Sequence, residues 1–302
     1  MHFESKQEVY VNNEQLISKV GSNNVDIIRE WLSKQLHLPK ISDKQLVIFL
    51  NCCQCNLEAT KKMIDAYYTM RTHNPDMFHN RKISELEKTF NIFYFHKMPL
   101  LPDGSRAGFS RLRDFNSNLF NTLDTIRLVF AMYDICIDED PLAPGWKFVM
   151  DMTGFSVGHL TKLTNLTLMR KCLAYVQTAL PMRLTAIIMI NAPPLTNQLM
   201  MFLKPLMHKD LYSLISIHSV SDMDSVYQSI PKEYFASDIG GKAPSFEAQK
   251  EESLERFKTY ESFFEDDEKF NRVDENKRID KNNQCNSLDY GLEGSFKKLE
   301  LD

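Results

Sequence analysis

The sequence predicts an α/β fold, because two strand patterns flank a helical pattern and a further helical segment precedes all three. Residues 146–151 form a short β-prone run, and residues 184–191 are nearly all apolar, as expected of a parallel strand covered on both faces. Residues 160–180 have helical spacing and end at Pro181. A right-handed crossover would place the two strands side by side in one sheet, and a third strand is expected at 214–218.

The first part of the chain is predicted to be a helical module. Residues 26–77 carry apolar side chains at helical spacing, with a break at Pro39. Asn56 is a favourable N-cap for a second helix, which stops at Asn74 and Pro75. We expect this second helix to pack on the first.

Three regions follow from these patterns. A helical module is expected over 1–95, a sheet domain over 96–246, and a C-terminal helix with an acidic polar tail over 247–302. Within the last region, residues 255–278 are predicted to form one helix, because aromatic side chains recur there at helical spacing. The residues after this helix are expected to be loosely held.

The segment between the second and third predicted strands has one apolar helical face. It follows Pro193 and Pro194, and the face consists of Leu195, Leu199, Phe202, Leu203 and Leu206. Two interpretations remain open. The helix covers the sheet, as helices do in open α/β domains, or it is a movable lid over a cavity.

Charge and composition exclude some classes of protein. The chain has 302 residues, 43% of them hydrophobic, and a net charge of -4. Residues 251–302 hold 15 acidic and 9 basic side chains, whereas the first 250 residues hold 25 and 27. Nucleic-acid binding requires a strong cationic surplus on one face, so no nucleic-acid partner is expected.

The apolar segments indicate a cytoplasmic protein with at most transient membrane contact. The N-terminus lacks the basic start and apolar core of a secretory signal. The apolar windows fall short of the ~20 residues that cross a bilayer. The six cysteines lack the spacing of a disulfide framework and are expected to be reduced.

Motifs for catalysis are missing, so no enzyme and no cofactor is expected. The sequence has no GxxxxGK[ST] phosphate loop, no GxGxxG after a strand and no GxSxG elbow. Cys52, Cys53 and Cys55 lie close together but lack a second ligand pair, which favours packing over a metal site. His159 and His218 are expected to be structural hydrogen-bonding residues.

Four ordered motifs resemble the CRAL-TRIO lipid-transfer family. They are DMTGFSVGHL, QTALPMRLTAIIMINAPPL, FLKPLMHKDLYSLISIHS and IPKEYFASDIGGKAP. The N-terminal stretch beginning REWLSKQLHLP resembles the family's helical companion module, and the end, GLEGSFKKLELD, resembles the tails of insect members of the tocopherol-carrier type. The resemblance implies a mixed or parallel sheet with flanking helices, and a lid helix over an apolar pocket.

The family's pocket positions fall on sixteen residues of this chain, nearly all apolar. They are Ile126, Val129, Tyr133, Trp146, Met150, Val157, Leu163, Cys172, Tyr175, Val176, Met182, Leu184, Ile187, Leu199, Phe202 and Leu203. The resemblance implies that they enclose one tocopherol-, retinoid- or phospholipid-like molecule. The hydroxyls of Tyr133 and Tyr175 would orient its polar group.

A phosphoinositide headgroup is a further candidate partner that the resemblance implies. In tocopherol-carrying members a basic groove outside the pocket holds such headgroups. The matching positions here are Asn51, Cys53, Arg183, Asp210 and Leu214, of which only Arg183 is positive. One charge does not supply the several hydrogen bonds of a polyphosphate, so phosphoinositide-triggered release is not expected.

The sequence therefore predicts a carrier that moves one hydrophobic lipid between membranes. A lipid-sensing adaptor, whose ligand occupancy controls a protein partner, is the alternative. An enzyme acting on a sequestered lipid comes last, because no paired acid and base is apparent in the sequence.

Overall fold

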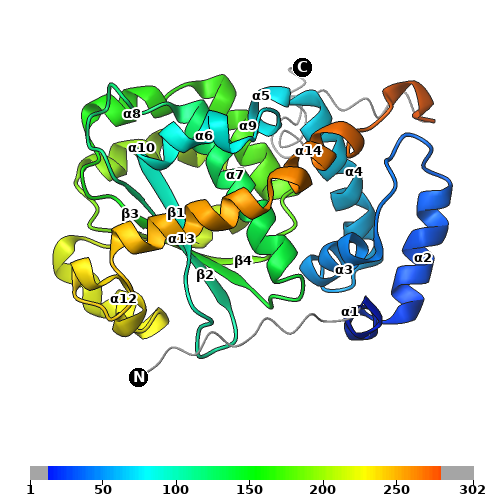
Figure 1. Cartoon of the computed structure of the whole chain (residues 1–302), viewed down its shortest axis with the longest axis horizontal. Coiled ribbons are helices and arrows are strands. Elements are labelled where there is room, and N and C mark those ends of the chain that lie inside the picture. The colour runs from blue at the N-terminus through cyan, green and yellow to red at the C-terminus, as the bar shows by residue number, and fades with distance from the viewer. Residues whose placement is uncertain (1–12, 280–302) are drawn as a thin grey trace, which may run out of the picture.

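The computed structural model describes residues 13–279, and this part of the chain contains a five-stranded sheet (Figure 1). The strands are β1 (Phe93–Lys97), β2 (Arg106–Leu112), β3 (Trp146–Asp151), β4 (Leu184–Ile190) and β5 (Ile215–Ile217). They lie in the order β1-β2-β3-β4-β5. Only β1 is antiparallel to its neighbour. The predicted α/β class is confirmed.

The three predicted strands are confirmed to within one residue at each end, whereas β1 and β2 were missed. β3 and β4 are parallel neighbours, as the crossover rule required. The sequence of β2 contains two arginines, a serine and Gly108, which weakened its strand pattern. A Cβ at Gly108 would lie 2.4 Å from the Phe95 ring and 2.9 Å from the Phe148 ring, so glycine lets both rings pack over β2.

Helices make up most of the remaining chain. The N-terminal helices are α1 (Asn13–Val20), α2 (Ser22–Ser33), α3 (Asp43–Cys52) and α4 (Leu57–His73). Around the sheet lie α5 (Pro75–Phe78), α6 (Ile83–Phe90), α7 (Thr122–Glu139), α8 (Val157–Leu163), α9 (Leu166–Thr178), α10 (Leu195–Leu203), α11 (Lys209–Ser213), α12 (Met223–Ser229), α13 (Phe246–Thr259) and α14 (Glu261–Phe270). None of the helices in residues 13–279 is long and apolar enough to cross a membrane.

The predicted N-terminal helices share one apolar core. Asn56 caps α4 by accepting a hydrogen bond from the Ala59 amide, as expected. Ile28 from α2 is buried with Ile64 and Tyr68 from α4, which confirms that the two helices pack together. The expected region boundaries after residues 95 and 246 stay predictions.

Two predicted single helices are each divided in the structure. The expected helix over 160–180 is wrong, because α8 ends at Leu163 and Asn165 begins α9 by accepting a hydrogen bond from the Leu168 amide. A side-chain cap starts a new helix more favourably than it continues an old one. The expected helix over 255–278 is also wrong: α13 starts earlier, and α14 follows it after Tyr260. Residues 280–302, including the tail motif, lie outside the described residues.

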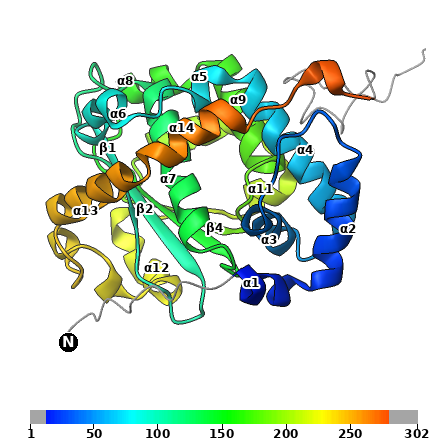
Figure 2. The ribbon, with the colours of Figure 1, turned by 45° about the vertical axis from the view of Figure 1, so that its right-hand side comes forward.

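The helices α13 and α14 connect the sheet to the N-terminal helices (Figures 1 and 2). Phe246 at the start of α13 packs against Tyr94 of β1, and Phe257 near its end packs against Phe90. This helix therefore covers the β1 edge of the sheet, which protects the edge from pairing with another chain. Beyond it, α14 reaches α4.

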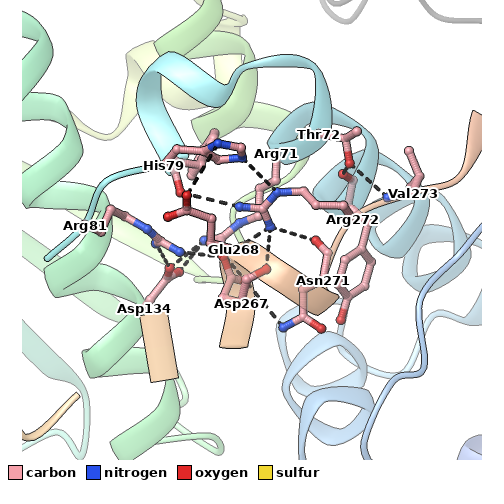
Figure 3. A network of polar contacts seen from close by, with 12 residues as sticks. Arg71, Thr72, His79, Arg81, Asp134, Asp267, Glu268, Asn271, Arg272 and Val273 are labelled. Carbon is pink, nitrogen blue, oxygen red and sulfur yellow. Dashed lines mark hydrogen bonds and ion pairs between the residues drawn. The ribbon is translucent and has the colours of Figure 1, made fainter. Parts of the chain in front are cut away.

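Two arginines and two aspartates form a buried network, which we call the clamp (Figure 3). Arg71 of α4 and Arg81 both pair with Asp134 of α7, at 2.7 and 2.6 Å, and with Asp267 of α14. All four side chains are almost completely buried. Burial opposes ionisation of Asp267, but Arg71 and Arg81 outweigh it and hold the pKa of this carboxyl below its usual range. The clamp thereby joins three helices that are distant in sequence.

We expect the Arg71→Met substitution to lower the free energy of unfolding by about 3–5 kcal/mol, because it removes one of the two buried arginines that neutralise Asp134 and Asp267 and leaves Arg81 between two buried carboxylates. The matched control is Arg29→Met, whose pairs with Asp26 and Asp43 are exposed and worth less than about 1 kcal/mol. Urea unfolding of both variants measures the difference. Equal losses would show that the clamp contributes no more than a surface pair.

Candidate functional site

The strand register gathers four predicted pocket residues on one face of the sheet. Met150 of β3 pairs with Met189 of β4, and Phe148 pairs with Ile187. Because side chains alternate along a strand, Met150 shares a face with Trp146, and Leu184 lies opposite Trp146 in β4. The four predicted residues on this face are therefore Trp146, Met150, Leu184 and Ile187. Residues of α7, α9 and α10 pack over this face. We call it the lid face.

The two faces of the central strands differ in burial. On the far face, Val149, Ile188 and Ile190 are almost completely buried. On the lid face, Met150 and Ile187 remain partly accessible, although both lie in inner strands beneath a helical layer. A side chain in that position is accessible only where the layer above it leaves space. The lid face is therefore less completely covered at Met150 and Ile187 than the far face is at Val149 and Ile188, although Trp146, Phe148 and Met189 of the lid face are buried.

Tyr133 of α7 and Cys172 of α9 pack on the same apolar cluster as Trp146 and Phe148. Burial raises the pKa of the Cys172 thiol to about 12 and raises the pKa of Tyr133 as well, so protein atoms surround both groups. Part of each side chain nevertheless remains accessible. Stacking on Phe148, at 4.5 Å between ring centroids, holds the Tyr133 ring in place.

The predicted lid helix, α10, lies across β3–β5 on the lid face. Pro193 and Pro194 precede it, and the short 3-10 turn Lys204–Leu206 ends it. Leu199 and Met200 are buried against Met152 and Met189. On the outer side Met201 is 76% exposed. The helix is thus anchored by a few apolar contacts and presents an apolar side chain outward.

Thirteen of the sixteen predicted pocket residues belong to two adjoining apolar clusters that share Leu203. They are Ile126, Tyr133, Trp146, Met150, Leu163, Cys172, Tyr175, Val176, Met182, Leu184, Leu199, Phe202 and Leu203. Val129 lies one turn from Ile126 and Tyr133 on α7, and Ile187 lies on the lid face. These fifteen positions are therefore brought together around α7, α9 and α10.

Two of the sixteen residues do not fill the role expected of them. Val157 is 67% exposed at the start of α8 and lies outside the buried clusters of the described chain. Tyr175 is completely buried, and its hydroxyl accepts hydrogen bonds from Arg71 at 3.1 and 3.2 Å. That hydroxyl is therefore occupied by the clamp, which leaves Tyr133 as the candidate for orienting a ligand.

Sequence reasoning missed Phe148, Met189 and Ile215, which also face the lid. The strand alternation of 146–151 could have identified Phe148, because it lies between Trp146 and Met150 at a spacing of two. Ile215 depends on the pairing of β5 with β4, where it lies opposite Ile187. Pairing between distant strands is a tertiary property, and the sequence carries no local signal for it.

The candidate phosphoinositide residue Arg183 lies outside the lid face. It borders a hollow with Asn51, Cys52, Asp140 and Trp146, between α3 and the sheet domain. The Arg183 guanidinium donates to the Pro144 carbonyl at 3.2 Å. Asp140 is the one other charged residue among the described residues that line this hollow. The lining therefore supplies no second cation for a phosphate.

His159 and the cysteines, which the sequence also offers as candidate functional residues, have structural environments. His159 is buried, and its Nδ1 lies 2.8 Å from the Ser156 hydroxyl in a helix-capping arrangement, as expected. The cysteines of the described chain are free thiols, and burial raises the pKa of Cys52 to about 12. Residues 13–279 contain no group of three or more His, Cys, Asp or Glu side chains that could hold a metal ion.

Comparison with known families identifies the family to which the sheet domain belongs. Residues 91–241 match the CRAL/TRIO domain, and residues 18–88 match the Pinta-like, UBA domain. The chain belongs to the CRAL/TRIO family. Members of this family bind or transfer lipids, and the resemblance read from the four sequence motifs is confirmed.

Individual relatives of this CRAL/TRIO chain are distant. The alpha-tocopherol transfer protein-like protein of Homo sapiens is 20% identical over 226 residues, which cover 73% of this chain and 65% of that protein. Clavesin-1 of Rattus norvegicus is 22% identical, covering 69% of this chain and 59% of its own length. The chain thus aligns to less than two thirds of either relative. The solved structure of Sfh5 matches with 16% identity and a TM-score of 0.46, covering 78% of this chain and 90% of Sfh5.

A pair of neighbouring isoleucines tests whether free space lies beneath α10. With space for a larger side chain, Ile187→Phe lowers the free energy of unfolding by less than about 1 kcal/mol, whereas Ile188→Phe overpacks the buried far face and should cost about 1–3 kcal/mol. Urea unfolding of the two variants provides the comparison. If Ile187→Phe were the more destabilising change, the lid face would be as tightly packed as the far face.

Proposed function

We propose that this CRAL/TRIO protein is a carrier that encloses one hydrophobic lipid between the lid face and α10. The observation that carries the proposal is the partly accessible surface of Met150 and Ile187 on inner strands beneath that helix. Space lined by apolar side chains admits an apolar molecule more readily than water, because water there would lack hydrogen-bond partners. Tyr133 provides the hydroxyl that would orient a tocopherol-, retinoid- or phospholipid-like ligand.

The energy of such a site is sufficient without a strong polar contact. Burying roughly 400 Å² of ligand surface at ~25 cal/mol per Å² contributes about 10 kcal/mol before association costs. A ligand held in this way leaves slowly through water. Transfer therefore requires α10 to move, and contact between Met201 and a bilayer surface would favour that movement.

Mass spectrometry identifies the ligand. The protein is incubated with a mixed lipid extract, repurified and extracted with organic solvent, and Phe202→Asp is treated in parallel. We expect one enriched lipid in the unaltered protein and its loss in the variant, because a carboxylate at the apolar lid contact opposes lipid burial. Equal lipid content in both proteins would contradict the pocket.

Transfer between vesicles tests the carrier role separately from binding. Met201→Asp should slow transfer about tenfold or more while leaving bound lipid unchanged, since Met201 points outward from α10. The control is Leu36→Asp, which adds the same charge at a 64% exposed site after α2 and should leave transfer unchanged. Fluorescent-lipid exchange measures the rates. Specific binding without transfer would favour the lipid-sensing adaptor instead.

A further inference from the structure

A serine, a histidine and an aspartate are connected in series at the β5 end of the sheet. The hydroxyl of Ser216 lies 2.9 Å from Nε2 of His218. On the other side of the ring, Nδ1 lies 2.9 Å from a carboxylate oxygen of Asp222. From the sequence alone, only a structural role is expected for His218. A nucleophile beside a base that a third group orients is the pattern of covalent catalysis.

Local structure explains why the three residues meet. Ser216 and His218 are two residues apart in an extended segment, so their side chains point to the same side. The 3-10 turn Val220–Asp222 then brings Asp222 back to the ring. Ser225 of α12 supports the carboxylate, since its hydroxyl lies 3.0 Å from the second oxygen of Asp222 and 3.0 Å from Nδ1 of His218.

The hydrogen-bond directions suit a general base. The hydrogen bond with His218, together with that from Ser225, holds the pKa of Asp222 below its usual range, so this carboxyl is ionised at neutral pH and accepts only. Nδ1 of His218 therefore carries the hydrogen that Asp222 accepts. This tautomer leaves a lone pair on Nε2, which accepts the hydroxyl hydrogen of Ser216.

The site is accessible at the edge of the sheet. In the pairing of β5 with β4, the Leu214 carbonyl accepts a hydrogen bond from the Ile187 amide, and the His218 amide donates one to the Met189 carbonyl. Backbone groups of successive residues point to alternate sides of a strand, so the N–H of Ile217 points away from β4. That N–H follows the serine directly and can donate to a developing oxyanion. The side chain of Ile217 points to the opposite face from Ser216, so the apolar surface on offer to an acyl chain is that of Val220, which is 75% exposed in the turn that carries Asp222.

We propose that Ser216, His218 and Asp222 form a second site, which hydrolyses esters of short hydrophobic acids. Ser216 and Ile188 are register partners, so the serine lies on the far face, opposite the lid face. The activity is therefore additional to lipid carriage and does not depend on it.

The reaction needs water as its only co-substrate. Oγ of Ser216 bonds to the ester carbonyl carbon, the carbonyl π pair moves to oxygen, and Nε2 of His218 takes the hydroxyl proton. The intermediate then expels the alkoxide, which receives that proton and leaves as the alcohol. Water next attacks the acyl-serine and gives a proton to Nε2. Cleavage of the bond to Oγ returns the proton to the serine and releases the carboxylic acid.

Hydrolysis of p-nitrophenyl butyrate by the purified full chain tests the proposal. We expect Ser216→Ala and His218→Ala to lower kcat by roughly 10²–10⁴-fold. Asp222→Asn should lower kcat with little change in KM, because Asp222 positions the ring and does not contact the ester. Ser219→Ala is the matched control, since Ser219 is a neighbouring exposed serine that bonds to Ser221, and it should retain full activity.

A fluorophosphonate probe reads out the nucleophile directly on the unaltered protein. The unaltered protein should be labelled at Ser216, identified by peptide mass spectrometry, and a lipid-binding variant such as Phe202→Asp should be labelled equally. Turnover in Ser216→Ala equal to that of the unaltered protein, or labelling at another serine, would overturn the proposal. If Phe202→Asp loses lipid binding but is still labelled at Ser216, the second site is supported, and its activity is distinguished from the carrier function.

Discussion

The buried clamp of Arg71, Arg81, Asp134 and Asp267 fixes the relative positions of the N-terminal helices, the sheet domain and the C-terminal helices (Figure 3). Four charges in a low-dielectric interior are tolerated only when each is paired with good geometry. Here each arginine pairs with both aspartates, so moving any one of the three helices would leave charges unpaired. This geometric requirement makes the clamp a constraint on the whole chain.

The lid-face site depends on that constraint. On α7, Asp134 belongs to the clamp and the adjacent Tyr133 packs on the apolar cluster of the lid face. On α9, the Tyr175 hydroxyl binds Arg71 and Cys172 packs on the same cluster. The two helices that form the walls of the site are therefore held by polar contacts behind them. In contrast, α10 is held by apolar contacts alone among those described, such as Leu199 on Met189. Rigid walls and a weakly held cover suit the proposed carrier.

The sheet separates two kinds of chemistry. Its lid face is apolar and belongs to the proposed lipid site, whereas the far face, at its β5 end, carries the Ser216–His218–Asp222 arrangement. The opposite edge, β1, is covered by α13, so the exposed edge and the candidate second site coincide. The edge strand β5 therefore ends the sheet and leaves the backbone N–H of Ile217 unpaired within the described sheet, next to Ser216.

The sequence by itself determined the α/β class, three strands and the N-terminal helices, while the pocket positions remain a prediction. Apolar periodicity and capping residues are local signals, and the family motifs supplied the pocket positions. Only the tertiary structure decided the clamp, the occupied hydroxyl of Tyr175, the exposure of Val157 and the meeting of His218 with Asp222. These depend on side chains brought together by folding, and no periodicity along the chain encodes such contacts.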